Sequence, residues 1–481
     1  MVTTRILIVG GGYAGFYTAL GLEKILGRGE AEVTVVDPLP YMTYQPFLPE
    51  VAAGSIEARH AVVSLRKHLK RTAVITARVT AIDHTAKTAT ISPEDGEPFD
   101  LEYDELVLTA GAVSRTFPIP GVADVAIGMK TIEEAAAVRD RLIANFARAS
   151  VLPEGPERTR LLTVVVVGGG FAGIEVFAEL RSLATSLIEL YPSITMDDIH
   201  FHLIEAMGRI MPEVSLETAK KVVAQLEARE AHVHLDTQLK SAVDGIVELS
   251  TGETFESDLI IWTAGVMANP MVRKTGLPLD ERGRVTAKTT LQVVDGDEIV
   301  ANAWTAGDVA AVPDVSKTPG PGGFCVPNAQ HAVRQGKLLA KNVAAALRGE
   351  APREYIHANQ GAVAGLGLGQ GAFQKGKIGF TGPLAWLAHR GYHGLAMPMW
   401  ERKLRVFGDW MGGFVLGRDD VQLAMRETPR EVFEEFASRP KPASDAVEAP
   451  KAAPIADTQP AKAEEQKAAA EAADEKAATK A

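Results

Sequence analysis

The chain has 481 residues, a length typical of two or three domains. Its 46% hydrophobic and 23% charged residues are ordinary for a globular enzyme, and a net charge of −11 argues against a basic nucleic-acid-binding protein. The one cysteine, Cys325, excludes a disulfide framework, a cysteine-based metal site and a redox-active dithiol. No other metal-ligand set is identified. The N-terminus lacks the features of a secretory signal, and no run of about 18 apolar residues predicts a spanning helix.

The N-terminal segment predicts a strand, a tight turn and the start of a helix. The apolar run RILIV leads into Gly10, Gly12 and Gly15, which have the spacing G-x-G-x-x-G. Such glycines permit the turn, the approach of a pyrophosphate and the close packing of helix on strand. The next predicted strand, AEVTVVD, ends in Asp37, 22 residues after Gly15. This is close to the spacing of about 20 expected for a ribose-binding carboxylate.

A second unit of the same kind follows the strand TVVVV. Gly168, Gly170 and Gly173 repeat the glycine spacing, and a long helix is predicted after them. The next predicted strand, IHFHLIE, ends in Glu205, 32 residues after Gly173, and we interpret segment 191–198 as an insertion that accounts for the longer spacing. Glu205 is therefore the ribose candidate of this unit. A solvated carboxylate at a strand end is the alternative interpretation.

Two predicted strands also repeat one another. YDELVLTAG at 103–111 and SDLIIWTAG at 257–265 share an acid, an apolar run and the ending Thr-Ala-Gly, and 301–308 predicts a further strand. This ending fits either a tight strand exit or a backbone that passes close to a cofactor. The repeats indicate an internal duplication of a nucleotide-binding unit, with one nucleotide in each copy. The other predicted elements are a loop at 41–54, antiparallel strands at 73–83 and 87–91, helices at 132–148 and 328–342, and two short strands within 365–380.

Several longer segments resemble one family. The chain resembles the type II NADH dehydrogenases, which are single-subunit, non-proton-pumping NADH:quinone oxidoreductases, over residues 5–423. The segments that carry the resemblance include VTVVDPLPYMTYQPFLPEVAAG, YDELVLTAGA, VVVVGGGFAGIE, IIWTAGV, WTAGDVA and PNAQHAVRQG. The resemblance implies an α/β fold with two Rossmann-like dinucleotide-binding domains, as in glutathione-reductase-like flavoproteins.

The resemblance also implies which residues bind nucleotides. Non-covalent FAD would lie at the first glycine turn, with Asp37 at its ribose, Val79 at its adenine and Asp308 at its ribityl chain. NADH, as substrate, would lie at the second turn. A carboxylate at Glu205 accepts from a ribose 2′-hydroxyl and repels a 2′-phosphate, which favours NADH over NADPH. Arg209, close in sequence, leaves the strictness of this preference open.

Two candidate catalytic residues follow from the same resemblance. Glu175 matches a glutamate near nicotinamide and flavin, where a buried carboxylate can relay a proton. Its alternative is a helix N-terminal acid stabilised by the macrodipole. Gln330 matches a glutamine at the quinone site, where its amide would donate to a quinone carbonyl. His331 is a weaker candidate proton donor, and Cys325 is interpreted as structural.

The C-terminal part changes character. An apolar stripe at helical spacing, with Arg402, Lys403 and Arg405 off the stripe, is typical of a helix that lies in a membrane interface; it consists of Trp400, Leu404, Phe407, Met411 and Phe414. An ordinary helix packed on the core or on a dimer partner is the alternative. The expected organisation is an FAD-binding domain at 1–118 and 286–380, an NADH-binding domain at 119–285, an amphipathic membrane-anchoring region at 381–438 and a disordered Ala/Pro/Lys/Glu-rich tail at 439–481.

Together these features predict an enzyme that passes a hydride from NADH to FAD and then two electrons and two protons to a membrane quinone. A homodimer bound peripherally at the cytoplasmic face of the cell membrane is expected, with no nucleic acid as partner. The alternatives are a sulfide:quinone oxidoreductase, which needs more cysteines than this chain has, and a soluble NADH-dependent reductase of an iron–sulfur carrier protein. A non-catalytic nucleotide sensor that works through the tail is a third.

Overall fold

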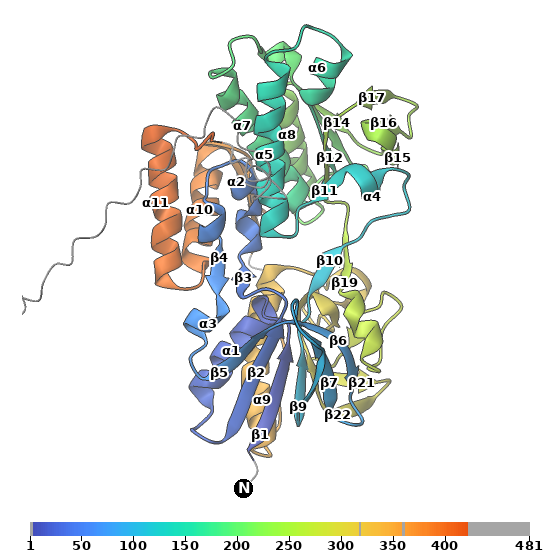
Figure 1. The fold of residues 1–481 in the computed structure, drawn as a ribbon, viewed down its shortest axis with the longest axis vertical. Coiled ribbons are helices and arrows are strands. Elements are labelled where there is room, and N and C mark those ends of the chain that lie inside the picture. The colour runs from blue at the N-terminus through green and yellow to red at the C-terminus, as the bar shows by residue number, and fades with distance from the viewer. Residues whose placement is uncertain (1–2, 317–318, 358–360, 422–481) are drawn as a thin grey trace, which may run out of the picture. The chain divides into compact units, whose positions relative to one another are not determined.

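The structure is a computed structural model that describes residues 3–316, 319–357 and 361–421. The predicted tail at 439–481 and the last part of the predicted anchoring region lie outside these residues. Within them, the N-terminal part of the chain and residues 292–305 together form a six-stranded sheet (Figure 1). In spatial order its strands are β21 (Gln292–Asp295), β22 (Glu298–Thr305), β9 (Glu105–Leu108), β1 (Thr4–Val9), β2 (Ala31–Asp37) and β5 (Thr72–Thr76).

This sheet is parallel except where β21 pairs with β22. The central strands are buried on both faces, which explains their continuous apolar sequences. Helices α1 (Tyr13–Ile25) and α9 (Ala329–Leu347) pack closely on one another. A Cβ at Gly336 would lie 2.5 Å from the Ala14 carbonyl oxygen, so glycine permits this contact.

The second sheet comes from the middle of the chain and is entirely parallel. In spatial order its strands are β11 (Ala126–Gly128), β18 (Leu259–Trp262), β12 (Thr163–Val167), β13 (His200–Ile204) and β14 (Ala231–His234). Its helices include α5 (Ile132–Ala149), α7 (Phe171–Ile188) and α8 (Leu216–Glu227). Two parallel sheets with helices confirm the predicted α/β class.

Two short strands carry the chain from one sheet to the other and back. β10 (Ala112–Ser114) pairs antiparallel with β19 (Val266–Ala268) (Figure 1). β10 follows the first Thr-Ala-Gly ending and β19 follows the second, so both sheets are left at equivalent points. The predicted domain boundaries at 118 and 286 remain predictions.

Three expectations from the sequence were wrong in detail. The segment predicted as one strand at 73–83 forms β5, which joins the parallel sheet, and β6 (Arg78–Asp83), which pairs antiparallel with β7 (Thr88–Ser92). The strand predicted over 101–111 is divided into β8 (Phe99–Glu102) and β9, because the Asp104 carboxylate accepts hydrogen bonds from the Arg5 backbone and side chain at the start of β1. The loop predicted at 41–54 contains β3 (Tyr41–Thr43) and a short helix, α2 (Leu48–Ala52). Pro49 lies in the first turn of α2, where a proline costs the helix no hydrogen bond.

The remaining elements are short. They are β4 (Val62–Ser64), α3 (Leu65–His68), α4 (Val122–Val125), α6 (Pro156–Leu161), β15 (Leu239–Ser241), β16 (Ile246–Leu249), β17 (Thr254–Glu256), β20 (Val285–Thr286) and β23 (Ala310–Ala311).

The C-terminal described part is a three-stranded antiparallel sheet followed by two helices. The strands are β24 (Ala362–Gly365), β25 (Gly371–Lys375) and β26 (Ile378–Thr381), and the helices are α10 (Pro383–Ala396) and α11 (Trp400–Leu416). α10 packs on β24 and β25. Among the described residues no helix is long and apolar enough to cross a membrane.

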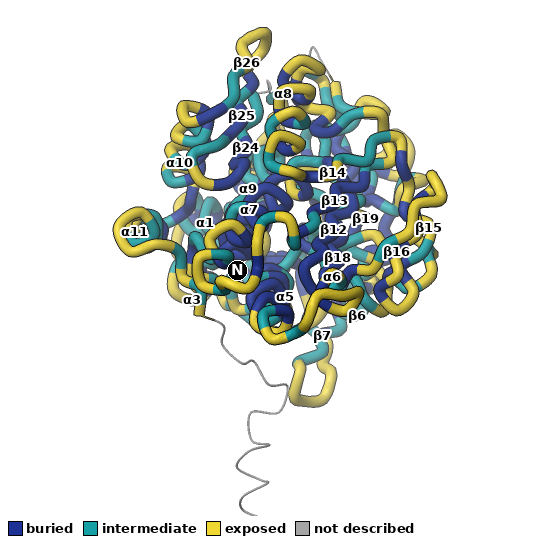
Figure 2. Tube along the Cα trace, turned by 90° about the horizontal axis from the view of Figure 1, so that it is seen from above, coloured by how far each residue is buried: buried dark blue, intermediate teal, exposed yellow. Residues whose placement is uncertain are grey.

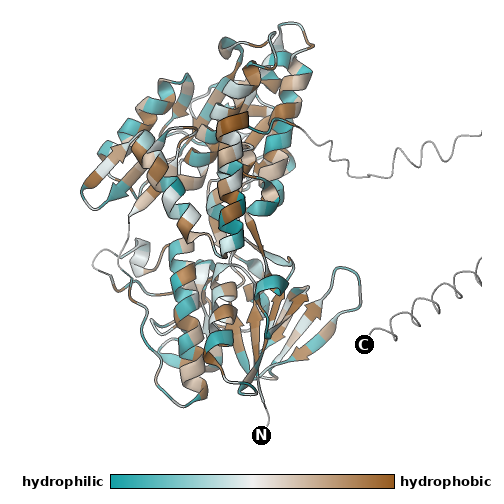
Figure 3. Ribbon diagram, turned by 90° about the vertical axis from the view of Figure 1, so that its left-hand side faces the viewer, coloured by the Kyte–Doolittle hydropathy of each residue, from teal (hydrophilic) through white to brown (hydrophobic). Residues whose placement is uncertain are grey.

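The apolar stripe of α11 faces away from the rest of the described residues. Trp400 is 73% exposed, Phe407 57% and Phe414 81%. In Figure 2 most of the α11 tube is exposed or intermediate, and in Figure 3 hydrophobic residues recur along this helix, which faces the viewer. The stripe is therefore not packed on the described core of its own chain.

Candidate active site

The first glycine turn has a separate steric reason for each glycine. Gly10 has φ +100°, and a Cβ there would lie 2.5 Å from the Thr109 carbonyl oxygen. At Gly15 a Cβ would lie 1.8 Å from the Gly10 carbonyl oxygen, so α1 approaches β1 too closely for any side chain. At Gly12 no atom lies within 4 Å of a Cβ position. Gly12 therefore keeps space open for a ligand, whereas the other two shape the turn.

A cavity of about 540 Å³ lies over this turn. Its lining includes five of the residues expected to hold FAD: Gly10, Gly12, Asp37, Val79 and Asp308. The sixth, Gly15, serves packing instead. The cavity volume lies within the range of about 300–1,000 Å³ that ligand sites occupy. An open glycine position and a strand-end acid in one cavity fit the pyrophosphate and ribose of a dinucleotide.

Two carboxylates in this cavity are held in place. Asp37 accepts from the backbone N–H of Gly11 at 2.6 Å and of Leu39 at 2.7 Å. Burial raises the pKa of Asp37, and these two hydrogen bonds counter the shift. Asp308 forms an ion pair with Lys130 at 3.4 Å. Lys130 was not identified from the sequence.

The second turn repeats the geometry of the first. Gly168 has φ +113°, and a Cβ at Gly173 would lie 1.9 Å from the Gly168 carbonyl oxygen. At Gly170 nothing lies within 4 Å of a Cβ position. Glu205 accepts from the backbone N–H of Gly169 at 2.5 Å and of Met207 at 2.7 Å. This acid therefore occupies the same place relative to its turn as Asp37 does.

Arg209 does not pair with Glu205. Its guanidinium donates to the carbonyls of Met211 at 3.3 Å and Val214 at 2.6 Å, so it braces its own loop. Arg209 therefore does not neutralise the Glu205 carboxylate at this turn.

The two Thr-Ala-Gly endings have matching roles. The Thr109 hydroxyl lies 3.1 Å from the Val9 carbonyl and 3.0 Å from the Gly10 carbonyl, and the Thr263 hydroxyl makes the equivalent contacts at the second turn. Thr109, Ala110 and Gly111 also line the cavity. At the first turn the ending is therefore a tight strand exit that borders the cavity, and its closeness to a cofactor stays a prediction.

Glu175 is buried on α7 and is held by two other elements. Its Oε1 accepts from the Gly365 backbone N–H of β24 at 3.0 Å and forms an ion pair with Nε2 of His389 on α10 at 3.2 Å. Glu175 is the fifth residue of α7, which begins at Phe171. Its partners are thus groups of the C-terminal elements and not the free N–H groups of the helix end.

His389 lies among carboxylates. Burial lowers the pKa of its imidazole, whereas the negative charges of Glu175, Glu50 and Glu179 raise it. The effect of the carboxylates is larger, so the pKa of His389 is raised above its usual value. Two of these acids have cationic partners in the C-terminal described part. Glu50 forms an ion pair with Arg390 of α10 at 3.2 Å, and Glu179 forms one with Arg418, which follows α11, at 3.2 Å.

The ionisable groups continue beyond His389. The His389 and His393 ring centroids are 4.6 Å apart, and Nδ1 of His393 lies 3.0 Å from the Tyr44 hydroxyl. Burial, together with the charge of His389, lowers the pKa of His393 well below its usual value. His389 was missed in the sequence. Its signal is the spacing of four residues to His393, which places both on one face of α10.

Gln330 is the second residue of α9. Its amide donates to the Gly361 carbonyl at 3.2 Å, and its neighbours Ala329 and Ala332 line the cavity. His331 Nδ1 lies 2.9 Å from the Tyr355 hydroxyl, and burial lowers the pKa of this imidazole. Burial raises the pKa of the Cys325 thiol to about 12, so this thiol is protonated and unreactive at neutral pH.

Comparison with known proteins agrees with this geometry. A sequence profile of the family described as pyridine nucleotide-disulphide oxidoreductase matches residues 4–336. The chain is 30% identical to the type II NADH:quinone oxidoreductase NdhA of Mycobacterium tuberculosis over 436 residues, 88% of this chain and 89% of that protein. It is 26% identical to a probable NADH dehydrogenase of Dictyostelium discoideum, covering 86% of this chain and 90% of the relative.

A solved structure shares the fold. NDH2 from Plasmodium falciparum in complex with NADH superposes with a TM-score of 0.80 at 18% identity, over 87% of this chain and 100% of that one. The family profile covers more than half of the chain, and the relative at 30% identity is matched over almost its whole length. The chain therefore belongs to the pyridine nucleotide-disulphide oxidoreductase family and, within it, to the type II NADH:quinone oxidoreductases.

Proposed function

We propose that this protein oxidises NADH and reduces a quinone, with FAD bound at the first glycine turn and NADH at the second. The observation that carries the proposal is the pair of complete, matching dinucleotide turns in a chain whose one cysteine is buried. Two nucleotides can bind, but a chain with one cysteine has no dithiol to take the electrons, so the electrons must leave for an external acceptor. The relatives are named for a quinone acceptor.

The chain's own residues bind and orient the two nucleotides. FAD, when bound, accepts a hydride from NADH and passes two electrons to the quinone. In our proposal Gly12 admits the FAD pyrophosphate, Asp37 accepts from its ribose, and Val79 and Asp308 meet its adenine and ribityl chain. Gly170 and Glu205 do the same for the pyrophosphate and ribose of NADH. Gln330 would donate its amide to the quinone after releasing the Gly361 carbonyl.

The Glu175–His389 pair would hold the proton that quinone reduction consumes. Reduction of a quinone by NADH consumes one proton from the medium beyond the hydride. A raised pKa keeps His389 protonated closer to neutral pH, and Glu175 orients the imidazole within the buried cluster. We propose that His389 holds this proton at Nε2 and that His393 and Tyr44 are the next groups in line.

One experiment separates the parts of this proposal. The purified yellow protein is mixed anaerobically with NADH, then with a short-chain quinone, while flavin absorbance is followed. Bleaching by NADH and recovery on adding quinone are expected. Bleaching without recovery would refute quinone as acceptor and favour an iron–sulfur carrier protein, whereas no bleaching would refute the dehydrogenase itself.

We further propose that the exposed stripe of α11 lies in a membrane interface. Nearby leucines of α10 add to it, since Leu384 is 72% and Leu395 78% exposed. A lipid-soluble quinone requires contact with the bilayer, and a stripe containing tryptophan suits a helix lying in the interface. Binding to the cytoplasmic face and a homodimer remain predictions of this proposal.

Vesicle flotation tests the stripe. Phe407→Glu is expected to weaken binding to phospholipid vesicles about 10-fold or more, because burying one such side chain is worth about 1.5–3 kcal/mol. Ile246→Glu is the matched control, since Ile246 is 49% exposed on β16, away from the stripe. If Phe407→Glu leaves vesicle binding unchanged but dissociates a dimer in sedimentation, the stripe is a dimer interface.

A further inference from the structure

Four histidines lie together on neighbouring strands of the second sheet, in a part of the molecule that the proposed reaction does not use. His200 and His202 are two residues apart on β13, and His232 and His234 are two residues apart on β14. Because side chains alternate across a strand, each pair faces one side of the sheet, and the parallel register places His202 opposite His232. The His202 ring stacks on both His232 and His234.

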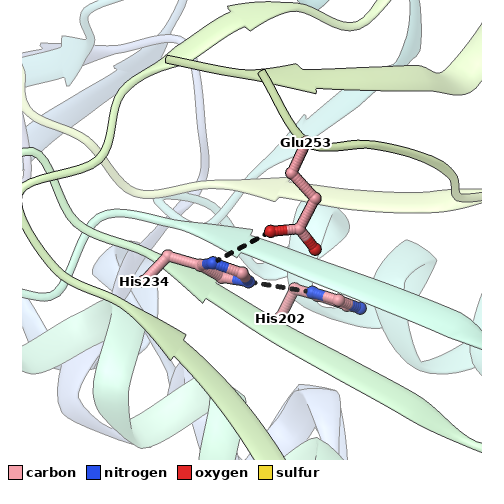
Figure 4. Close-up of side chains that lie close together, drawn as sticks. All are labelled: His202, His234 and Glu253. Carbon is pink, nitrogen blue, oxygen red and sulfur yellow. Dashed lines mark hydrogen bonds and ion pairs between the residues drawn. The ribbon is translucent and has the colours of Figure 1, made fainter. Parts of the chain in front are cut away.

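Two of these imidazoles are joined to a carboxylate (Figure 4). Nδ1 of His202 lies 3.0 Å from Nε2 of His234, and Nδ1 of His234 lies 3.8 Å from a carboxylate oxygen of Glu253. Glu253 belongs to the turn between β16 and β17, so a surface hairpin meets the edge strand β14 here. Each of the three residues offers one ligand atom, and these atoms lie within 4.8 Å of one another.

We propose that His202, His234 and Glu253 form a site for a divalent first-row transition metal ion such as Zn²⁺, with water completing its coordination. Two imidazoles and one carboxylate make a donor set that binds Zn²⁺ tetrahedrally. Ligand atoms around such an ion lie roughly 3.4 Å apart. Nδ1 of His202 and Nε2 of His234 are 3.0 Å apart, near that separation. The half-exposed Glu253 side chain, which lies beside Nδ1 of His234, would have to move toward Nε2, and the two rings would have to adjust slightly.

The surroundings favour neutral, aligned imidazoles. Burial, followed by the neighbouring histidines, lowers the pKa of His202 to about 3, and burial also lowers the pKa of His234. Both rings are therefore unprotonated at neutral pH, the form that binds metal. The Phe255 ring stacks on His202 at 4.0 Å and restricts its rotation. This site goes beyond the sequence prediction, which identified no metal-ligand set.

The site adjoins the NADH turn without belonging to it. The His234 carbonyl accepts from the Glu205 backbone N–H at 2.9 Å, so the ligand strand directly supports the ribose carboxylate. A bound ion would join the β16–β17 hairpin to β14 and thereby stiffen the strand that holds Glu205 in place. Its expected role is structural, because no ligand belongs to the residues proposed to touch NADH or FAD.

Calorimetry on tag-free, chelator-treated holoenzyme tests the proposal with Zn²⁺ as the probe. One Zn²⁺ per chain is expected, with a rise in thermal midpoint that depends on Zn²⁺ concentration. His234→Ala should abolish stoichiometric binding, and Glu253→Gln should weaken it at least about tenfold. His200→Ala is the control, since His200 lies on β13 beside the ligand His202 but outside the ligand set, and this variant should bind Zn²⁺ as the wild type does.

Misfolding should not explain weaker binding by Glu253→Gln, because the Glu253 side chain is 49% exposed. Circular dichroism and FAD content of this variant should match those of the wild type. Visible absorption of the Co²⁺-loaded protein provides a second readout, with a four-coordinate spectrum in the wild type and in His200→Ala. Absence of stoichiometric binding by the wild type would overturn the proposal. Equal Zn²⁺ affinity in the wild type and Glu253→Gln would also overturn it, since the ion would then lie elsewhere.

Discussion

Replacement of Glu175 by Gln tests the proposed proton-handling pair most directly. The amide keeps an oxygen that can accept from the Gly365 N–H, so the contact between α7 and β24 is preserved and only the charge is lost. At 3.2 Å, the attraction between Glu175 and a protonated His389 is about 5 kcal/mol for an effective dielectric constant of 20. Its loss removes the main cause that raises the pKa of His389, so this pKa falls.

With its pKa lowered, His389 would be a poorer holder of the proton that the quinone needs. Since a positioned acid typically contributes about 10²–10⁴-fold, kcat for quinone reduction should fall about 100-fold or more. FAD content should not change, and anaerobic stopped-flow should show that reduction of the flavin by NADH slows much less than its reoxidation by quinone.

Glu179→Gln is the matched control, because it removes a buried carboxylate one turn further along α7 whose partner is Arg418. It should lower the unfolding midpoint but leave turnover near the wild-type value. A Glu175→Gln enzyme with kcat within about twofold of the wild type would refute the reasoning and leave Glu175 as a structural acid.

Further predictions concern the second turn and pH. Gly170→Ala should fold and raise KM for NADH at least about tenfold, whereas Gly173→Ala should yield unstable protein, because its Cβ would lie 1.9 Å from a carbonyl oxygen. Glu205→Gln should lower kcat/KM for NADH about 10–100-fold, the worth of one charged hydrogen bond, without an equal loss for NADPH; an equal loss would refute the ribose role. The pKa of His389 is raised in the folded state, so its ion pair with Glu175 stabilises the folded protein. This stabilisation is fully present below the unfolded-state pKa of about 6.5 and is lost as pH rises through the folded-state pKa. Urea unfolding should therefore show the stability difference between wild type and Glu175→Gln shrinking from pH 5.5 to 9, and a difference that does not change with pH would contradict a charged pair.

The sequence predicted the features whose signals are local. The two glycine turns, the acids Asp37 and Glu205, and the stripe of α11 each follow from spacing along one short segment. The glycine spacing also assigned a separate role to each glycine, and the structure has Gly12 and Gly170, the second glycine of each turn, as the open positions.

Features built from distant segments could not be predicted in this way. The ion pair of Glu175 with His389 joins residues more than 200 positions apart. Its effect on the pKa of His389 depends on the burial of both side chains. The division of the strand predicted over 101–111 depends on Arg5, which lies almost 100 residues earlier. The position of Glu253 beside His234 depends on how a hairpin folds back onto the edge of the sheet.

The composition of the six-stranded sheet has a consequence for how the chain folds. Its strand β9 pairs on one side with β1, which is made early, and on the other with β22, which follows almost 200 residues later. The five-stranded sheet comes from the single stretch between them. During synthesis the middle of the protein can therefore fold while the first sheet still has a bare apolar edge. Chains that end before residue 298 should keep that edge and aggregate, even though they carry the complete second glycine turn.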